Sequence, residues 1–101
     1  MDSRPNLQTF LENVLGSRNV YFNPPESIRM SYPAIVYSRK RIDNSRANNA
    51  VYKRSIAYEV TVIDEDCDSE IVDKMSLLPM CSYDRHFKSD NLNHDVFTLY
   101  Y

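Results

Sequence analysis

The segment from Tyr52 to Asp64 alternates between apolar and polar side chains, a pattern typical of a β-strand with one buried face. The apolar side chains of that face are Ile56, Tyr58, Val60 and Val62. The residues between them, Ala57, Glu59 and Thr61, fall on the opposite face, because successive side chains of a strand point to opposite sides. We therefore predict that one face of this strand packs in a core while the other meets water or a neighbouring chain.

Two helices are predicted, one on each side of this strand in the sequence. Residues 7–15 carry apolar side chains at helical spacing, and Gly16, the only glycine of the chain, suits the end of that helix. A second helix follows the strand, with Asp66 or Asp68 as its N-cap and carboxylates in its first turn. Pro79 ends the second helix, because proline cannot continue a helical ladder.

Three further strands complete the prediction. Residues 34–41 are rich in β-branched and aromatic side chains and follow a proline-rich connector at residues 19–33. Residues 42–50 have the composition of a loop, with Asn, Asp and Ser and no apolar period. Residues 80–89 and 94–101 are predicted as the last two strands, joined by a turn.

The predicted order is helix, strand, strand, helix, strand, strand, which indicates an α+β fold. We expect a mostly antiparallel four-stranded sheet with the helices packed on one face and a long β-hairpin loop. A chain of 101 residues corresponds to one domain, spanning residues 1–101.

Charge is divided along the chain into two sets. The basic set is Arg39, Lys40, Arg41, Arg46, Lys53 and Arg54. The acidic set is Asp64, Glu65, Asp66, Asp68, Glu70 and Asp73. The formal net charge is −2, which argues against a general polyanion binder. Tyrosines lie among the basic residues, so three interpretations stay open: a solvated hairpin, head-to-tail self-assembly, and binding of single-stranded nucleic acid.

No catalytic, cofactor or metal site is predicted. The acidic run alternates like the start of a calcium loop, but Ser69 and Met75 occupy the positions that require glycine and a bidentate glutamate. The two cysteines and two histidines lack the short spacings of a zinc site, and no context supports a Cys–His nucleophile pair. We therefore expect a protein that is not an enzyme.

Membrane insertion and secretion are also not expected. No apolar run approaches the roughly 20 residues that a spanning helix needs. The N-terminal sequence MDSRPNLQTF lacks the charged and then apolar layout of a secretory signal. These features favour a protein that acts in a cytoplasm or leaves the cell by lysis.

Most of the chain, from Tyr21 to Tyr101, resembles the small tail-completion or tail-terminator proteins of tailed bacteriophages and prophages. The most specific blocks read PPES…YP.IVY, VTVID.D.DSEI.DK…LP and DNLNH..FTLYY. One departure is Cys67, where the pattern often carries proline at the helix start; the fold tolerates either residue there.

The resemblance implies a structural virion protein at the head-proximal end of the tail, assembled in the host cytoplasm. Such proteins form a ring, usually of six copies, that ends polymerisation of the tail tube and joins the head. The implied partners are other copies, the tail tube protein and a neck or head-completion protein.

The resemblance also leaves two roles for the basic segment from Arg39 to Arg54. It resembles a long hairpin that reaches either a neighbouring copy, where it meets the acidic set, or the channel, where it faces passing DNA. We favour the contact between copies, because the same chain supplies the acidic complement. The alternatives are another neck or head-completion connector and a small nucleic-acid-binding module that uses this hairpin.

Overall fold

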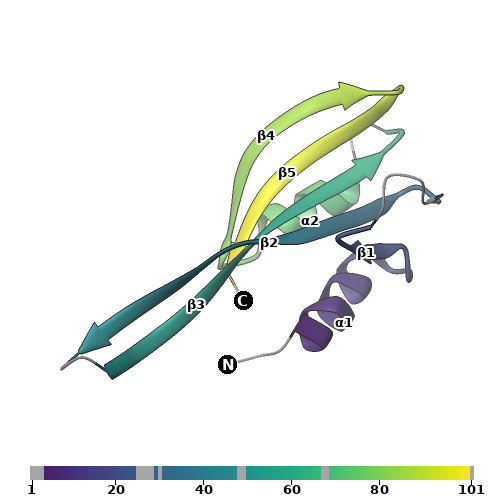
Figure 1. Cartoon of the computed structure of the whole chain (residues 1–101). Helices are drawn as coiled ribbons and strands as arrows, with labels where there is room; N and C mark the ends of the chain where they lie inside the picture. Colours follow the sequence, from purple (N-terminus) through teal and green to yellow (C-terminus); the bar gives the residue numbers. More distant parts are fainter. Residues whose placement is uncertain (1–3, 25–28, 30, 48–49, 67–68, 101) are drawn as a thin grey trace.

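The computed structural model describes residues 4–24, 29, 31–47, 50–66 and 69–100, with the backbone alone for residues 4–5, 43–47 and 50–55. In chain order the elements are α1 (Arg4–Leu15), β1 (Val20–Phe22), β2 (Ala34–Ala47), β3 (Ala50–Asp64), α2 (Glu70–Ser76), β4 (Cys81–Ser89) and β5 (Leu92–Tyr100). The described part of the chain thus forms an α+β fold with two helices and one mixed sheet (Figure 1).

The sheet has the strand order β1-β2-β3-β5-β4. The pairings of β2 with β3, β3 with β5 and β5 with β4 are antiparallel, as predicted. The prediction of four strands is wrong, because β1 adds a fifth strand that runs parallel to β2, with Val20 opposite Ile35. Three residues are too few to show alternation, and Pro24 follows closely, so the sequence pattern favoured a connector at this place.

The hairpin of β2 and β3 is also longer than the sequence indicates. A loop is predicted at residues 42–50, but in the structure the two strands stay paired as far as Ala47 opposite Ala50. The polar composition is misleading here, because the hydrogen bonds of a β-ladder join backbone groups and do not require apolar side chains. Residues 48 and 49 lie outside the described ranges.

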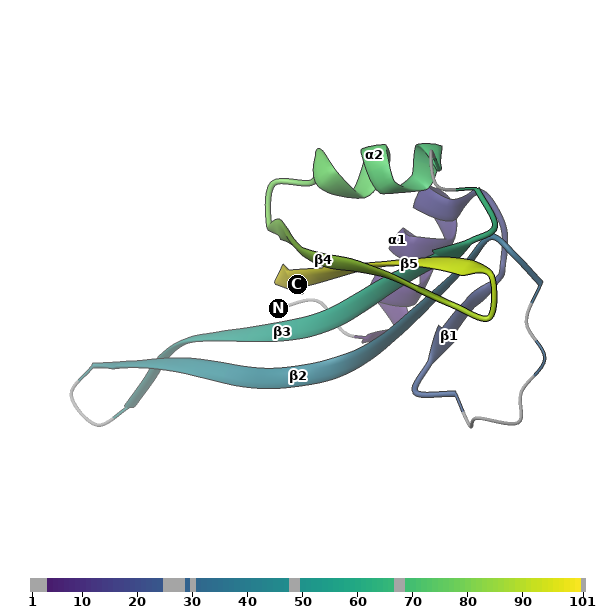
Figure 2. The ribbon, with the colours of Figure 1, turned by 90° about the horizontal axis from the view of Figure 1, so that it is seen from above.

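Beyond the end of β5, this hairpin continues as a two-stranded projection that we call the arm (residues 42–47 and 50–56). β5 ends at Tyr100, opposite Ala57, so the residues of β3 before Ala57 pair with β2 alone. At about 3.3 Å per residue, this part of β3 extends roughly 23 Å. The arm extends away from both helices (Figure 2) and contributes to the longest dimension of the molecule, 51 Å.

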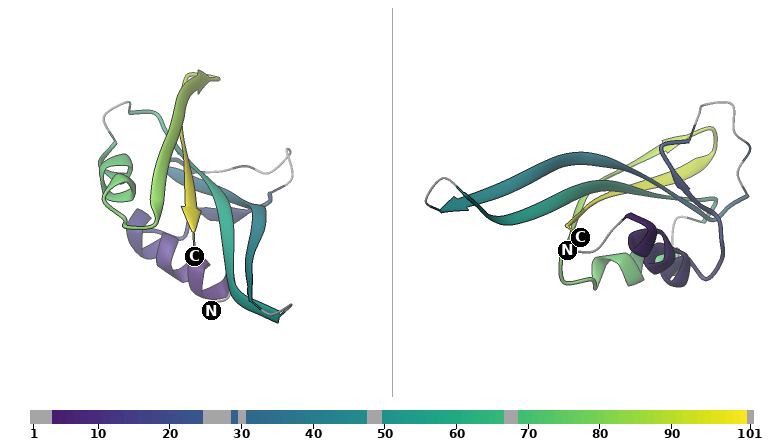
Figure 3. Two further views of the ribbon diagram at one scale, coloured as in Figure 1. Left: turned by 90° about the vertical axis from the view of Figure 1, so that its left-hand side faces the viewer. Right: turned by 60° about the horizontal axis from the view of Figure 1, so that its bottom comes forward.

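Both helices pack on one face of the sheet, as predicted (Figure 3, right). The helices contribute to the core Leu7, Leu11, Leu15, Ile71 and Met75. The strands contribute Ile35, Tyr37, Ile56, Tyr58, Val60, Val62, Phe97 and Leu99. The predicted apolar face of β3 is confirmed, since its four side chains are all buried in this core. The Tyr37 hydroxyl also donates a hydrogen bond to Gln8 Oε1 at 2.6 Å, which ties α1 to β2.

Two tight turns take the backbone conformation that their residues favour. Gly16 has a φ of +81° and its N–H donates to the Glu12 carbonyl at 2.8 Å, so the predicted end of α1 is confirmed. Asp90 and Asn91 join β4 to β5 with φ values of 53° and 63°. Positive φ at both central residues is typical of a two-residue hairpin turn, and Asn and Asp tolerate it well.

The start of α2 differs from the prediction. Ser69 is the N-cap, and its hydroxyl accepts a hydrogen bond from the Ile71 N–H at 3.3 Å. The predicted cap at Asp66 is therefore wrong, and Asp68 lies outside the described ranges. The N–H of Asp66 instead donates to Asp64 Oδ1 at 3.1 Å, so these residues form a local turn before the helix.

Replacing Val60 by aspartate should unfold the domain. Val60 is fully buried at the centre of the sheet, and the substitution places an unpaired charge in the core. We expect a loss of more than about 4 kcal/mol in the free energy of unfolding, measured by urea titration with circular dichroism. The control Leu77→Ser changes a highly exposed side chain and should stay within about 0.5 kcal/mol of wild type. Equal stability of the two variants would contradict the assigned core.

Candidate assembly surfaces

The basic and acidic sets lie towards opposite ends of β3 (Figure 1). β3 begins in the arm at Ala50 and ends at Asp64, and at about 3.3 Å per residue its length is roughly 46 Å. All six residues of the basic set lie on β2 and β3, in the arm or where it joins the body. In the acidic set, Asp64 ends β3, Glu65 and Asp66 follow it, and Glu70 and Asp73 lie on α2. The fold thus separates the two sets in space as well as along the chain.

A β-bulge at the base of the arm directs two basic side chains towards β5. The register of β2 and β3 shifts between Arg39 and Arg41. Lys40 Nζ donates to Thr98 Oγ1 at 3.3 Å, and the Arg41 guanidinium donates to the Tyr100 hydroxyl and lies 5.6 Å from its ring centroid. Thr98 and Tyr100 alternate with core residues of β5, so both contacts lie on the face that no helix covers.

A second bulge, in β4, adds an acidic side chain to the same cluster. The register of β4 and β5 shifts between Tyr83 and Arg85. Asp84 Oδ2 accepts a hydrogen bond from Thr98 Oγ1 at 2.7 Å and lies 4.0 Å from Lys40 Nζ. Because the lysine and the carboxylate are both partly exposed, we expect this ion pair to contribute no more than about 1 kcal/mol. Its main effect is to orient the Lys40 side chain of β2 towards β4 and β5.

These contacts divide the three basic residues at the base of the arm. Lys40 and Arg41 interact with β5 of their own chain, as described above. Arg39 is exposed, and among the described contacts no hydrogen bond or ion pair of its side chain is present. The backbones of Arg46, Lys53 and Arg54 lie in the arm. Arg39 and the arm are therefore the parts of the basic set that we assign to a contact with another copy, and this assignment stays a prediction.

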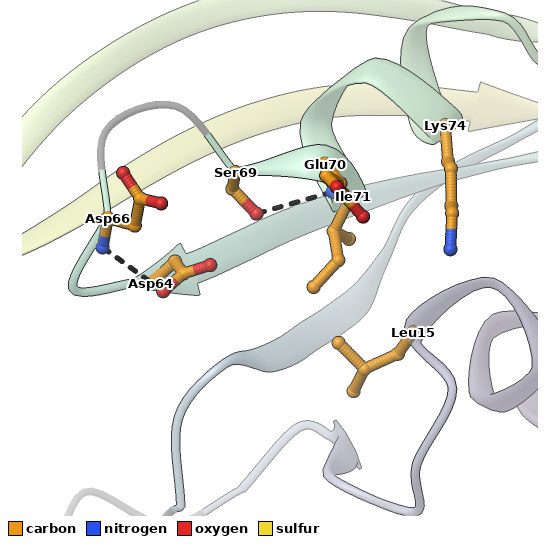
Figure 4. A pocket seen from close by; sticks show the side chains of 7 residues that line it. All are labelled: Leu15, Asp64, Asp66, Ser69, Glu70, Ile71 and Lys74. Atoms are coloured by element: carbon orange, nitrogen blue, oxygen red, sulfur yellow. Dashed lines mark hydrogen bonds between the residues drawn. The ribbon is translucent and has the colours of Figure 1, made fainter.

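Three residues of the acidic set, Asp64, Asp66 and Glu70, line a hollow of ≈ 380 Å³ between the end of α1 and the start of α2 (Figure 4). The polar residues that line it are Asp64, Asp66, Ser69, Glu70 and Lys74. Leu15 and Ile71 point towards one another across the hollow. A long basic side chain suits such a surface, because its aliphatic stem can lie on apolar groups while its charged end meets the carboxylates.

The last two strands hold the acidic loop in place. Asn93 is buried, and its side-chain amide donates to the Glu65 carbonyl at 3.3 Å. His86 Nε2 lies 3.1 Å from Asn93 Oδ1, which fixes the orientation of that amide. On the same face, the Tyr83 hydroxyl donates to Asp95 Oδ1 at 3.0 Å. The bond from the Asn93 side chain to the Glu65 backbone thus anchors the loop to a strand that is distant in sequence, while the other two bonds join β4 to β5.

An apolar groove of ≈ 250 Å³ lies beside the base of the arm. It is lined by Phe10, Leu78, Pro79, Met80, Leu99 and Tyr100. The Tyr100 N–H donates to the Met80 carbonyl at 2.9 Å, which fixes the segment after α2 against the end of β5. Leu77 next to the groove is 83% exposed and Met80 is 56% exposed. The groove is therefore part of an apolar surface. This surface lies at the base of the arm, where Arg41 contacts Tyr100.

Sequence reasoning did not predict this groove or the cluster on the helix-free face. Both depend on tertiary structure, since Lys40 on β2 meets Asp84 on β4, and Phe10 of α1 lines the same groove as Met80, which follows α2. The bulges have no recognisable sequence signature in this chain. One available signal was the run from Leu77 to Met80, where four apolar residues follow a helix that is already complete.

The described histidines and Cys81 lie in separate local environments. No three His, Cys, Asp or Glu side chains in the described ranges lie close enough together to hold a metal ion. His94 stacks on Phe87 with a centroid distance of 4.6 Å, and His86 is held by Asn93 as described above. Burial, with a smaller effect from the Asp84 carboxylate, raises the pKa of the Cys81 thiol to about 11. A thiol with such a pKa stays protonated near neutral pH and is a poor nucleophile.

Alkylation of Cys81 at pH 8 should therefore be slow. The rise in its pKa from 9.0 to about 11 lowers the thiolate fraction roughly a hundredfold relative to the unfolded chain. We expect a similar reduction in the rate of reaction with iodoacetamide, followed by mass spectrometry of the peptide that contains Cys81. The same peptide in urea-unfolded protein is the control. Equal rates in the folded and unfolded chain would contradict the shielded thiol.

Comparison with known proteins assigns no family. No protein-family model matches the chain, and no curated protein matches it. Among the residues that the structure describes, no helix is long and apolar enough to cross a membrane. The function must therefore be inferred from the residues and from their arrangement.

Proposed function

We propose that this chain is a structural subunit whose copies join head to tail into a ring. In this proposal the arm of one copy lies over the acidic end of the next, so that the basic set meets the acidic set. The observation that carries the proposal is the position of the two sets towards opposite ends of β3. The chain provides both partners of the contact, and each can be engaged by a different neighbour.

The resemblance to ring-forming tail proteins favours a ring over a symmetric dimer. In a dimer with a two-fold axis, both charged ends of each copy would be used by one and the same partner. A contact in which each end meets a different neighbour is heterologous, and it closes into a ring when the rotation from copy to copy allows. Complementary charge then sets the register and the rate of association more than the final affinity.

The biological setting of the proposal comes from the resemblance to tail-completion and tail-terminator proteins. The ring, usually of six copies in such proteins, is proposed to end the tail tube of a bacteriophage and to join it to the head. Its further proposed partners are the tail tube protein and a neck or head-completion protein, and its proposed location is the virion. We propose no reaction and no cofactor.

Reversing the charges available for this contact should abolish assembly. The test variant carries Arg39→Glu, Lys53→Glu and Arg54→Glu, and it leaves Lys40 and Arg41 bound to β5. We expect unchanged folding, because Arg39 is exposed and the other two residues lie in the arm. The association constant, measured by light scattering in low salt, should fall by at least about tenfold, and tails assembled with this variant should have abnormal length.

The control reverses two exposed basic residues outside the arm, with Arg18→Glu and Arg29→Glu. This control should assemble as the wild type does, since these residues lie outside the arm. Normal rings and normal tails formed by the arm variant would contradict the proposal. Salt-dependent binding of single-stranded DNA by a wild-type monomer, lost in the arm variant, would instead favour the nucleic-acid-binding module.

A further inference from the structure

We infer that the contact between copies has an apolar centre, in which the groove beside the base of the arm receives Tyr32 and Phe87 of the next copy. This inference rests on the proposed head-to-tail assembly. It names the apolar residues at the centre of the contact, around which the basic and acidic sets form the rim. It assigns a partner to the exposed apolar surface of Leu77, Met80 and the groove, which the charge argument leaves unexplained.

The groove is formed by three segments of the chain that hold its walls in place. α1 supplies Phe10, β5 supplies Leu99 and Tyr100, and the segment after α2 supplies Leu78, Pro79 and Met80. The hydrogen bond from Tyr100 to Met80 holds two of these walls together. Almost no polar atom lines the groove, so a charged occupant would lose its hydration without gaining a partner. The groove therefore suits an apolar or aromatic side chain.

Suitable side chains lie at the acidic end of the same chain. Phe87 is 41% exposed, and the register places it on one row across the sheet, Ala34–Ile63–His94–Phe87. Tyr32, 37% exposed, precedes that row by two residues. Ile63 in the row is followed directly by Asp64, so Phe87 lies at the level where the acidic set begins, on the other face of the sheet from Asp64. Stacking on His94 at 4.6 Å already orders the Phe87 ring, which reduces the entropy lost on binding.

The arrangement of charge identifies a second copy as the occupant. Arg39 lies close to the groove along the sheet. It pairs with Tyr58, and the preceding residue, Ala57, pairs with Tyr100, which lines the groove. A partner that brings carboxylates to Arg39 and to the arm is positioned to cover the groove as well. The acidic end of this chain carries both the carboxylates and the exposed aromatic rings. Such a contact has the usual composition of a protein interface, with an aromatic centre and a charged rim.

The first test removes apolar surface without changing charge. The variant Leu77→Ser with Met80→Ser should remain folded, because Leu77 is highly exposed and Met80 is more than half exposed. We expect its association constant, measured by sedimentation of the full chain over a range of concentrations, to fall by about tenfold or more. The control variant Leu77→Ile with Met80→Leu keeps the apolar surface and should associate as the wild type does.

The second test asks which surfaces meet. Chains that carry Leu77→Cys are mixed under oxidising conditions with chains that carry Phe87→Cys, both with Cys67→Ser. Cys81 contributes little background, because burial raises its pKa to about 11. We expect disulfide-linked dimers in the mixture and few in either variant alone. Efficient linkage of Leu77→Cys to itself would show a back-to-back contact and would overturn the inference.

The two proposals fail in different ways. If the serine variant assembles normally while the arm variant does not, the head-to-tail contact stands and its apolar centre is wrong. If the wild-type chain stays monomeric at every concentration, the apolar centre is wrong, because it predicts self-association by this chain alone. The length of tails made with the arm variant then decides the proposed function independently.

Discussion

The structure depends on the place where β5 ends. Tyr100 pairs with Ala57 at the midpoint of β3, and beyond this pair β3 has only β2 as a neighbour. The second half of β3 lies at the centre of the sheet and supplies Tyr58, Val60 and Val62 to the core. The first half leaves the body as the arm, except that Ile56 at its base still packs in the core. β3 therefore stabilises the domain and, together with β2, projects the basic set, and the paired strands separate the two charged ends.

The base of the arm is reinforced on the helix-free face. Two bulges, one in β2 and one in β4, direct Lys40 and Asp84 to Thr98, and Arg41 reaches Tyr100 from the same side. Bulges bend strands and increase their local twist, so the bulge in β2, at the exit of the arm, also affects the direction of the arm. Part of the basic set thus serves the fold of its own chain. The basic side chains that we assign to a partner are therefore those of Arg39 and the arm. The proposed contact between copies uses fewer basic residues than the sequence indicates.

Sequence reasoning succeeded where a local pattern is strong. The alternation at residues 56–62 identified the core face of β3, and Gly16 marked the end of α1. It failed at β1, which is too short for a period, and at residues 42–50, where backbone pairing continues through polar side chains. The separation of charge was visible in the sequence because the basic and the acidic residues fall in two successive segments of the chain. The groove beside Phe10 was not, because its walls come from three separate segments.

The central claim is that identical copies meet through different ends, with the arm of one over the acidic end of the next. Electron cryomicroscopy of the assembled protein, alone or at the head-proximal end of purified tails, tests it most directly. We expect a closed ring in which density for each arm lies across the neighbouring copy and contacts the segment from Asp64 to Asp73. Arms that point into an open channel without touching a neighbour, or copies related by two-fold axes, would contradict the account.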